Sequence, residues 1–178
     1  MNLFTPSRVH WQQGKQSVTV EQTTTYPESD ATTLTIHTTK PTRFVLHVRV
    51  PGWTAKPVIV KINDRPSQAK AEPGTFLEIE RIWREGDMLQ VTFPMALRFE
   101  PIARETPNRQ ALLFGPLLLV ALSDKPVSME GEKATIDVVK QRDALPTFRT
   151  HEGAITFLPF YKVKDERYTT YLSIPSIQ

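Results

Sequence analysis

The sequence predicts an all-β protein, an antiparallel β-sandwich of the jelly-roll kind with little or no helix. Thr, Val and Ile together account for 45 of the 178 residues, and these β-branched side chains favour strands over helices. Apolar and polar residues alternate with the two-residue period of a strand that has one buried face. Prolines and glycines separate the alternating runs at intervals of about ten residues, which is typical of sandwiches and jelly rolls.

The first clear strand is expected at residues 44–50, followed by strands at 58–62 and 89–93. A slip of one residue would turn the apolar set of a strand toward solvent, so the buried face can be stated residue by residue. It is expected to hold Phe44, Leu46, Val48, Val50, Val58, Val60, Ile62, Leu89, Val91 and Phe93. Turns are expected at Pro51-Gly52, Asn63-Asp64-Arg65-Pro66, Pro73-Gly74, Glu85-Gly86-Asp87 and Gly115-Pro116.

The apolar run at residues 111–122 predicts core strands, because it is shorter than the about 20 residues of a membrane-spanning helix and Gly115-Pro116 interrupts it. Residues 98–106 are the best helix candidate, but Pro101 breaks them, so at most one or two short helical turns are expected. Strand character returns at 154–160 and 168–174. We therefore expect one domain over 1–178, with a core sandwich at 1–122, an irregular connection at 123–150 and closing strands at 151–178.

Composition excludes several classes of function. The chain has no cysteine, which rules out disulfides, Cys-ligated zinc and a thiol nucleophile. The net charge is +3, but both signs are interspersed without a Lys/Arg block, which argues against a nucleic-acid partner. No membrane segment, metal site or cofactor motif is found. Residues 1–11 do not form a signal peptide, so a cytoplasmic and a periplasmic location are both expected alternatives.

No catalytic motif emerges from the ionisable residues. His10, His37, His47 and His151 stand apart in the sequence, and His37 and His47 lie on the outward phase of strands. Glycoside hydrolysis uses two carboxylates, for which Glu28 with Asp30 and Asp165 with Glu166 are the candidate pairs. The alternative for the first pair is a solvated turn, and for the second an ion pair with Arg167 or a neighbouring strand.

Aromatic residues near turns are the other candidates, because sugars stack their apolar faces on Trp and Tyr rings. Trp11, Trp53, Trp83 and Tyr26 are such positions. A Trp at a strand end also serves to close one end of a β core, and this alternative stands beside sugar stacking. Trp53 is the best of these candidates for sugar binding, since Pro51-Gly52 place it just beyond a strand, but closing the end of the core is the role favoured for it.

Six segments carry a family resemblance: residues 2–7, 44–53, 83–87, 93–95, 111–117 and 160–169. The most specific pieces are Val50-Pro51-Gly52-Trp53, Leu113-Phe114-Gly115-Pro116-Leu117 and Asp165-Glu166-Arg167-Tyr168-Thr169. Together they resemble the carboxy-terminal β-domain of the DUF1680 glycoside hydrolases, the β-L-arabinofuranosidase family (glycoside hydrolase family 127). The chain departs from the family pattern at Lys164, where His is usual, and at Leu172, where Trp is common.

The resemblance implies a domain without catalytic residues. In this family the chemistry belongs to an (α/α)6 barrel, where a zinc-held cysteine is the nucleophile, and none of those residues can be carried over to a chain without cysteine. The Asp165–Tyr168 motif is then expected to be structural, with Arg167 pairing with a carboxylate and Tyr168 presenting an apolar face with a polar tip. The resemblance also suggests that Met1 begins in mid-protein.

Two readings of function follow, with a third behind them. The first is an accessory β-sandwich domain that packs against a catalytic barrel, in the same chain or as a separate protein. The second is a freestanding carbohydrate-binding module for plant-type or microbial glycans. The third is a small hydrolase using Glu28, Asp30, Asp165 or Glu166.

Overall fold

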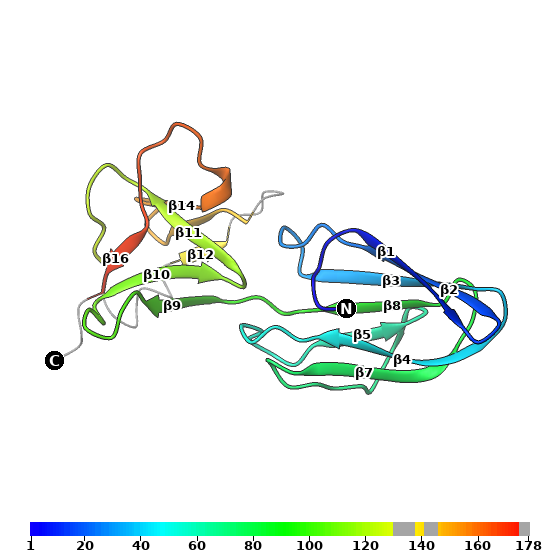
Figure 1. Cartoon of the computed structure of the whole chain (residues 1–178). Coiled ribbons are helices and arrows are strands. Elements are labelled where there is room, and N and C mark those ends of the chain that lie inside the picture. Colours follow the sequence, from blue (N-terminus) through cyan, green and yellow to red (C-terminus); the bar gives the residue numbers. More distant parts are fainter. Residues whose placement is uncertain (130–137, 141–145, 175–178) are drawn as a thin grey trace. The chain divides into compact units, whose positions relative to one another are not determined.

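The computed structural model describes residues 1–129, 138–140 and 146–174. Contacts divide the chain into two compact units, Met1–Met95 and Ala96–Gln178 (Figure 1). The sequence predicts one domain with a core sandwich over 1–122 and therefore no boundary after Met95. The boundary is not visible in the sequence, because the apolar alternation continues through Met95, Leu97 and Phe99.

The described secondary structure is almost entirely β, and every pairing between its named strands is antiparallel, as predicted. The first unit contains β1 (Ser7–Gln13), β2 (Gln16–Thr23), β3 (Ala31–Thr38), β4 (Thr42–Arg49), β5 (Ile59–Ile62), β6 (Arg65–Pro66), β7 (Phe76–Trp83) and β8 (Met88–Thr92). The second contains β9 (Leu97–Pro101), β10 (Arg109–Phe114), β11 (Leu117–Leu122), β12 (Val138–Lys140), β13 (Phe148–Thr150), β14 (Thr156–Pro159), β15 (Tyr168–Thr169) and β16 (Tyr171–Ser173). The short 3-10 helix η1 (Phe160–Lys162) is the one helical segment of the described residues.

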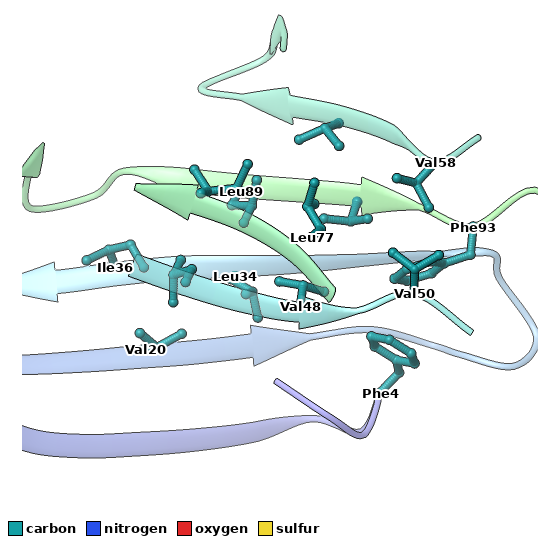
Figure 2. Packing of buried hydrophobic residues seen from close by; sticks show 14 of the residues in the cluster. Phe4, Val20, Leu34, Ile36, Val48, Val50, Val58, Leu77, Leu89 and Phe93 are labelled. Carbon is teal, nitrogen blue, oxygen red and sulfur yellow. The ribbon is translucent and has the colours of Figure 1, made fainter. Parts of the chain in front are cut away.

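In the first unit, a six-stranded sheet in the order β1-β2-β3-β8-β5-β6 and the two-stranded sheet β4-β7 share one hydrophobic core. Figure 2 shows how the labelled side chains pack there, with Phe4, Val50 and Phe93 at the same end. The predicted buried face is confirmed: eight of its ten residues are buried, and Phe44 and Ile62 are partly buried and pack against the same core. Period-two alternation therefore determines the strand register in this unit.

Two predicted turns show why their residues are needed. Asn63 and Asp64 join β5 to β6 with φ of 50° and 61°, a left-handed conformation that Asn and Asp tolerate better than most side chains. Asn63 Nδ2 also donates to Asp87 Oδ1 at 2.7 Å, which ties this turn to the one before β8. At Gly115-Pro116, which joins β10 to β11, Gly115 has φ of 55°.

The second unit is built on a sheet in the order β12-β13-β14-β11-β10-β16, to which β9 and β15 are added at β10 and β11. Its own core contains buried residues from β10, β11, β13, β14 and β16, among them Leu112, Leu119 and Phe157. The predicted strands at 154–160 and 168–174 correspond to β14, β15 and β16. The predicted connection at 123–150 contains β12 and β13, and parts of it lie outside the described residues, as does the end of the closing segment.

No helix in the described parts of the chain has the length and apolar character needed to cross a membrane.

Candidate functional site

Trp83, one of the predicted sugar-stacking residues, belongs to the core of the first unit. It has 0% exposed surface, and its indole Nε1 donates to the Phe44 carbonyl oxygen at 3.1 Å. Its ring stacks on the Phe44 ring at 5.8 Å, and the Arg81 guanidinium lies 5.1 Å from its centroid. A ring without an exposed face cannot stack on a sugar, so Trp83 has the core role that the sequence left as its alternative.

Trp11 lies on the edge strand β1 and is partly buried against the same core. Its ring meets the Phe44 ring edge to face at 5.3 Å, and its Nε1 donates to Gln13 Oε1 at 3.2 Å. One side of the indole is therefore used for packing.

Tyr26 and Trp53 come together at the end of the core marked by Phe4 and Phe93. Their rings stack with centroids 6.3 Å apart and an interplanar angle of 21°. Phe4 continues the series inward, 5.3 Å from Tyr26 and 4.5 Å from Phe93. Burial raises the pKa of the Tyr26 phenol above its usual value of 10.0, while the hydrogen bond from Trp53 acts in the opposite direction. The phenol therefore stays neutral at physiological pH.

These two rings border a pocket of about 230 Å³ that lies wholly within the first unit. Besides the two aromatic residues it is lined by Asn2, Leu3, Phe4, Arg49, Pro51 and Gly52. The pocket thus combines apolar ring surface with one cationic side chain, a composition that suits a small polar ligand with an apolar face. It is the candidate site of this unit.

Hydrogen bonds of the backbone hold the walls of this pocket. Val50 N donates to Thr75 O at 2.8 Å, and Gly74 N donates to Val50 O at 2.9 Å. Thr54 is buried, and its hydroxyl donates to Pro51 O at 2.8 Å. The segment that carries Gly52 and Trp53 is therefore fixed on both sides.

The Asp165–Tyr168 motif borders a different pocket, in the second unit. This pocket of about 450 Å³ is lined by Ser123, Asp124, Lys125, Pro126, Glu166, Arg167, Tyr168 and Thr169. Glu166 Oε2 accepts a hydrogen bond from Lys164 N at 2.8 Å, and this contact lowers the pKa of the exposed carboxyl below its usual 4.5. The predicted pairing of Arg167 with a carboxylate is not found among the described residues. Tyr168 meets Phe160 edge to face at 5.7 Å.

The two positions that depart from the family pattern have structural roles in this chain. The backbone N–H of Lys164 makes the turn contact with Glu166. Leu172 is 1% exposed and belongs to the second core.

The first carboxylate pair lies in backbone contacts, and His37 and His47 have carboxylate partners. Glu28 N donates to Thr25 O at 2.9 Å and Phe93 N donates to Asp30 O at 2.7 Å, so the backbone around the first carboxylate pair forms a turn. His37 Nδ1 lies 2.8 Å from Glu85 Oε1, and His47 Nδ1 lies 3.3 Å from Glu78 Oε1. Within residues 1–129, 138–140 and 146–174, no group of three His, Asp or Glu side chains is placed to hold a metal ion.

Sequence reasoning found Tyr26 and Trp53 but missed Arg49 and Phe4. Arg49 reads as an ordinary outward residue at the end of β4, and Phe4 precedes the first alternating run. The sequence feature that could have marked Arg49 as a candidate site residue is its position directly before the Val50–Trp53 segment.

Comparison with known proteins gives matches by sequence family and by fold. The family model "Beta-L-arabinofuranosidase, GH127 middle domain" matches residues 1–95, which is also the extent of the first unit. A search of curated proteins returns no significant match.

Solved structures share the fold over nearly the whole chain. A protein described as a glycoside hydrolase is similar with a TM-score of 0.74 and 18% identity, over 98% of this chain and 35% of its own. A GH127 β-L-arabinofuranosidase from Geobacillus stearothermophilus T6 gives 0.68 and 20%, over 97% and 33%. A further GH127 β-arabinofuranosidase gives 0.70 and 20%, over 97% and 34%. The chain thus spans about a third of the length of these proteins.

Proposed function

The chain belongs to the GH127 β-L-arabinofuranosidase family through its middle domain, and on this basis we propose that it is a non-catalytic accessory domain of a glycoside hydrolase. In this role it packs against a catalytic (α/α)6 barrel, in the same chain or as a separate protein. The observation that carries the proposal is the middle-domain match over residues 1–95 in a chain without cysteine. The nucleophile implied by the family resemblance is a cysteine, and further cysteines are among the implied zinc ligands, so a chain without cysteine has no residue to take their place.

The outer face of the second unit's sheet supports packing against a further domain. The side chains that point away from the second core include Leu113, Leu118, Leu122 and Leu158, all only half-buried. Phe160, Tyr161, Tyr168 and Tyr171 add four aromatic side chains that are 42–50% exposed. A sheet that is apolar on both faces is typical of a sheet covered on both sides.

The occupant of this face that we propose is the catalytic domain. The similar solved structures are about three times as long as this chain, so each contains further chain outside the shared fold. An apolar surface of the barrel would bury the leucine and aromatic side chains. Each side chain would then contribute to the free energy of association in proportion to the apolar area it buries.

The experiment that tests the proposal is a hydrolysis assay on aryl β-L-arabinofuranosides with the purified chain, with and without added zinc. We expect a rate equal to that of a heat-inactivated control. Turnover that disappears in Glu28→Gln or Glu166→Gln would overturn the proposal and favour a small hydrolase. A full-length GH127 enzyme serves as the positive control for substrate quality.

A second candidate function is glycan binding at the Tyr26–Trp53 pocket. The observation that favours it is that two of the four aromatic residues predicted from the sequence line one pocket and stack on each other. Plant-type and microbial glycans are the candidate ligands, and such binding is compatible with an accessory role.

A further inference from the structure

We propose that the Tyr26–Trp53 pocket selects an acidic sugar, with the guanidinium of Arg49 pairing with the carboxylate of a hexuronic acid. This inference rests on the glycan-binding function proposed above and adds the charge of the ligand. It is argued from the position of Arg49, from its lack of an acidic partner and from the size of the pocket.

Arg49 is the last residue of β4, and its backbone is held in place. Arg49 N donates to the Met1 carbonyl oxygen at 2.9 Å, and the next residue, Val50, is bonded to Thr75 and Gly74. The side chain is on the outward phase of the strand and lines the pocket beside Pro51 and Trp53. Because the backbone of Arg49 is already fixed, less conformational entropy is lost when its side chain binds a ligand.

Three of the five other arginines of the first unit have carboxylate partners, whereas Arg65 and Arg84, like Arg49, make no ion pair among the described residues. Arg8 pairs with Glu21 at 2.7 Å, Arg43 with Glu80 at 3.0 Å and Arg81 with Asp87 at 3.5 Å. Among the described residues, Arg49 makes no ion pair, and its register partner on β7 is Phe76, which carries no charge. The side chain of Arg49, a residue that lines the pocket, is therefore available to pair with an anion from outside.

The chemistry of the walls selects the kind of anion. Tyr26 and Trp53 line the pocket and are only partly buried, so the part of their ring surface that stays exposed can contact the C–H face of a sugar ring. A guanidinium presents a planar fork that matches a carboxylate with two parallel hydrogen bonds. A hexuronic acid carries both features on one ring.

The size of the pocket limits the ligand to about one sugar ring. Its volume of about 230 Å³ lies below the roughly 300–1,000 Å³ of sites that hold drug-sized ligands. A longer glycan would place one residue in the pocket and extend over the surface. Binding by one ring is weak, so the affinity of a single sugar is expected in the millimolar range, near 1 mM or above.

The chain offers a variant that fills the pocket without disturbing the fold. Gly52 lines the pocket, and a Cβ added there meets no atom within 4 Å. Gly52→Leu therefore adds bulk at the pocket wall without a clash at Cβ, whereas Arg49→Gln removes the charge and keeps a polar side chain. Arg43→Gln is the matched control, because it removes the same charge from the same strand outside the pocket.

The test is a titration of the chain, followed by two-dimensional NMR, with the methyl glycosides of D-galacturonate and D-glucuronate and with their uncharged methyl esters. We expect at least one of the acids to bind about tenfold more tightly than its ester, which corresponds to about 1.4 kcal/mol. Arg49→Gln should remove this preference, Gly52→Leu should abolish binding, and Arg43→Gln should behave as the unchanged chain.

The outcomes separate this inference from the function on which it rests. Equal affinity for acid and ester, or a preference that survives Arg49→Gln, overturns the acidic-sugar assignment and leaves a neutral sugar site. Binding that persists in Gly52→Leu places the ligand outside the pocket and overturns the assignment. Absence of binding by all four compounds overturns both the assignment and glycan binding, while the hydrolysis assay still tests the accessory role.

Discussion

Trp83 combines the largest buried side chain of the first core with a partly buried hydrogen bond to Phe44 O. Trp83→Phe removes the indole donor to Phe44 O and vacates part of the ring volume. We expect the free energy of unfolding to fall by about 2–4 kcal/mol, measured by urea denaturation.

Trp11→Phe is the matched control for this change. The Trp11 indole N–H donates to an exposed Gln13 side chain, for which water can substitute. Its loss should cost less than about 1 kcal/mol. Equal destabilisation by the two substitutions would contradict the core assignment of Trp83.

The lowered pKa of the Glu85 carboxyl predicts that the stability of the protein depends on pH. The hydrogen bond with His37, followed by that with Thr38 N, lowers the pKa of the Glu85 carboxyl below its usual 4.5. A carboxyl whose pKa is lower in the folded state stabilises the protein above the unfolded pKa, and this contribution is lost as the pH falls through the folded pKa.

Glu85→Gln should therefore lower the unfolding midpoint in urea at pH 7, and the variant and the unchanged chain should converge as the pH falls below 4.5 and through the lowered pKa of the folded state. Glu100→Gln is the control, since Glu100 is an exposed acid of the second unit that pairs with Arg98 at 2.8 Å. A stability difference that is constant from pH 3 to pH 7 would refute the role of the charge.

At this scale the sequence predicts burial better than function. Leu77, Ile79 and Trp83 share one phase of β7, so the period-two rule applied to that strand is enough to bury Trp83. Tyr26 and Trp53 could be named as candidates from their chemistry alone. Arg49 could not, because its functional interest arises from the absence of an acidic neighbour, which depends on the register of β4 with β7.

The apolar outer face of β10 and β11 indicates that another part of the protein or a partner covers these strands. In the sequence the run 111–122 is apolar without alternation, and in the fold both faces of this hairpin are apolar. The same pattern is typical of strands covered on both sides. Where η1 lies against β11, Val120 is already fully covered, while Phe160 and Tyr168 stay about half exposed.

If this face is a docking surface, the chain alone should bind the dye ANS in its folded state. Phe160→Ser combined with Tyr168→Ser should lower the fluorescence, because it removes the aromatic pair from the surface. The unfolding free energy should fall by no more than about 1.5 kcal/mol, since both rings are partly exposed.

Ile59→Ser is the matched control for that experiment, because Ile59 is 54% exposed on a strand of the other unit, opposite Thr92. It should leave the fluorescence unchanged. A decrease equal to that of the double variant would mean that the dye does not report on the β10–β11 face.

The order of the strands in the sheets could not be predicted from the sequence. Alternation assigns the buried side chains of β4, β5 and β8, but it does not pair β3 with β8 or β4 with β7. Those pairings join residues far apart in the sequence, and nothing local specifies them. The strands β2 and β3 are rich in Thr, whose half-polar side chain weakens the apolar alternation that marks a strand.

At the scale of the whole molecule, the two units have separate hydrophobic cores. Every residue of the first cluster, from Met1 to Phe93, lies before position 95, and every residue of the second, from Leu97 to Ile174, lies after it. The GH127 middle-domain match ends at the same position. A core that is closed within 1–95 predicts a unit that is stable by itself.

Calorimetry of the full chain should therefore show two unfolding transitions. Leu34→Ala and Leu119→Ala each remove a buried leucine, 0% and 1% exposed, from one core only. Each should cost about 2–5 kcal/mol and lower one transition by roughly 8 °C or more, while the other stays within about 2 °C. If both substitutions lower a single shared transition, the two units unfold together. The boundary at Met95 then separates two sets of contacts but not two independently stable units.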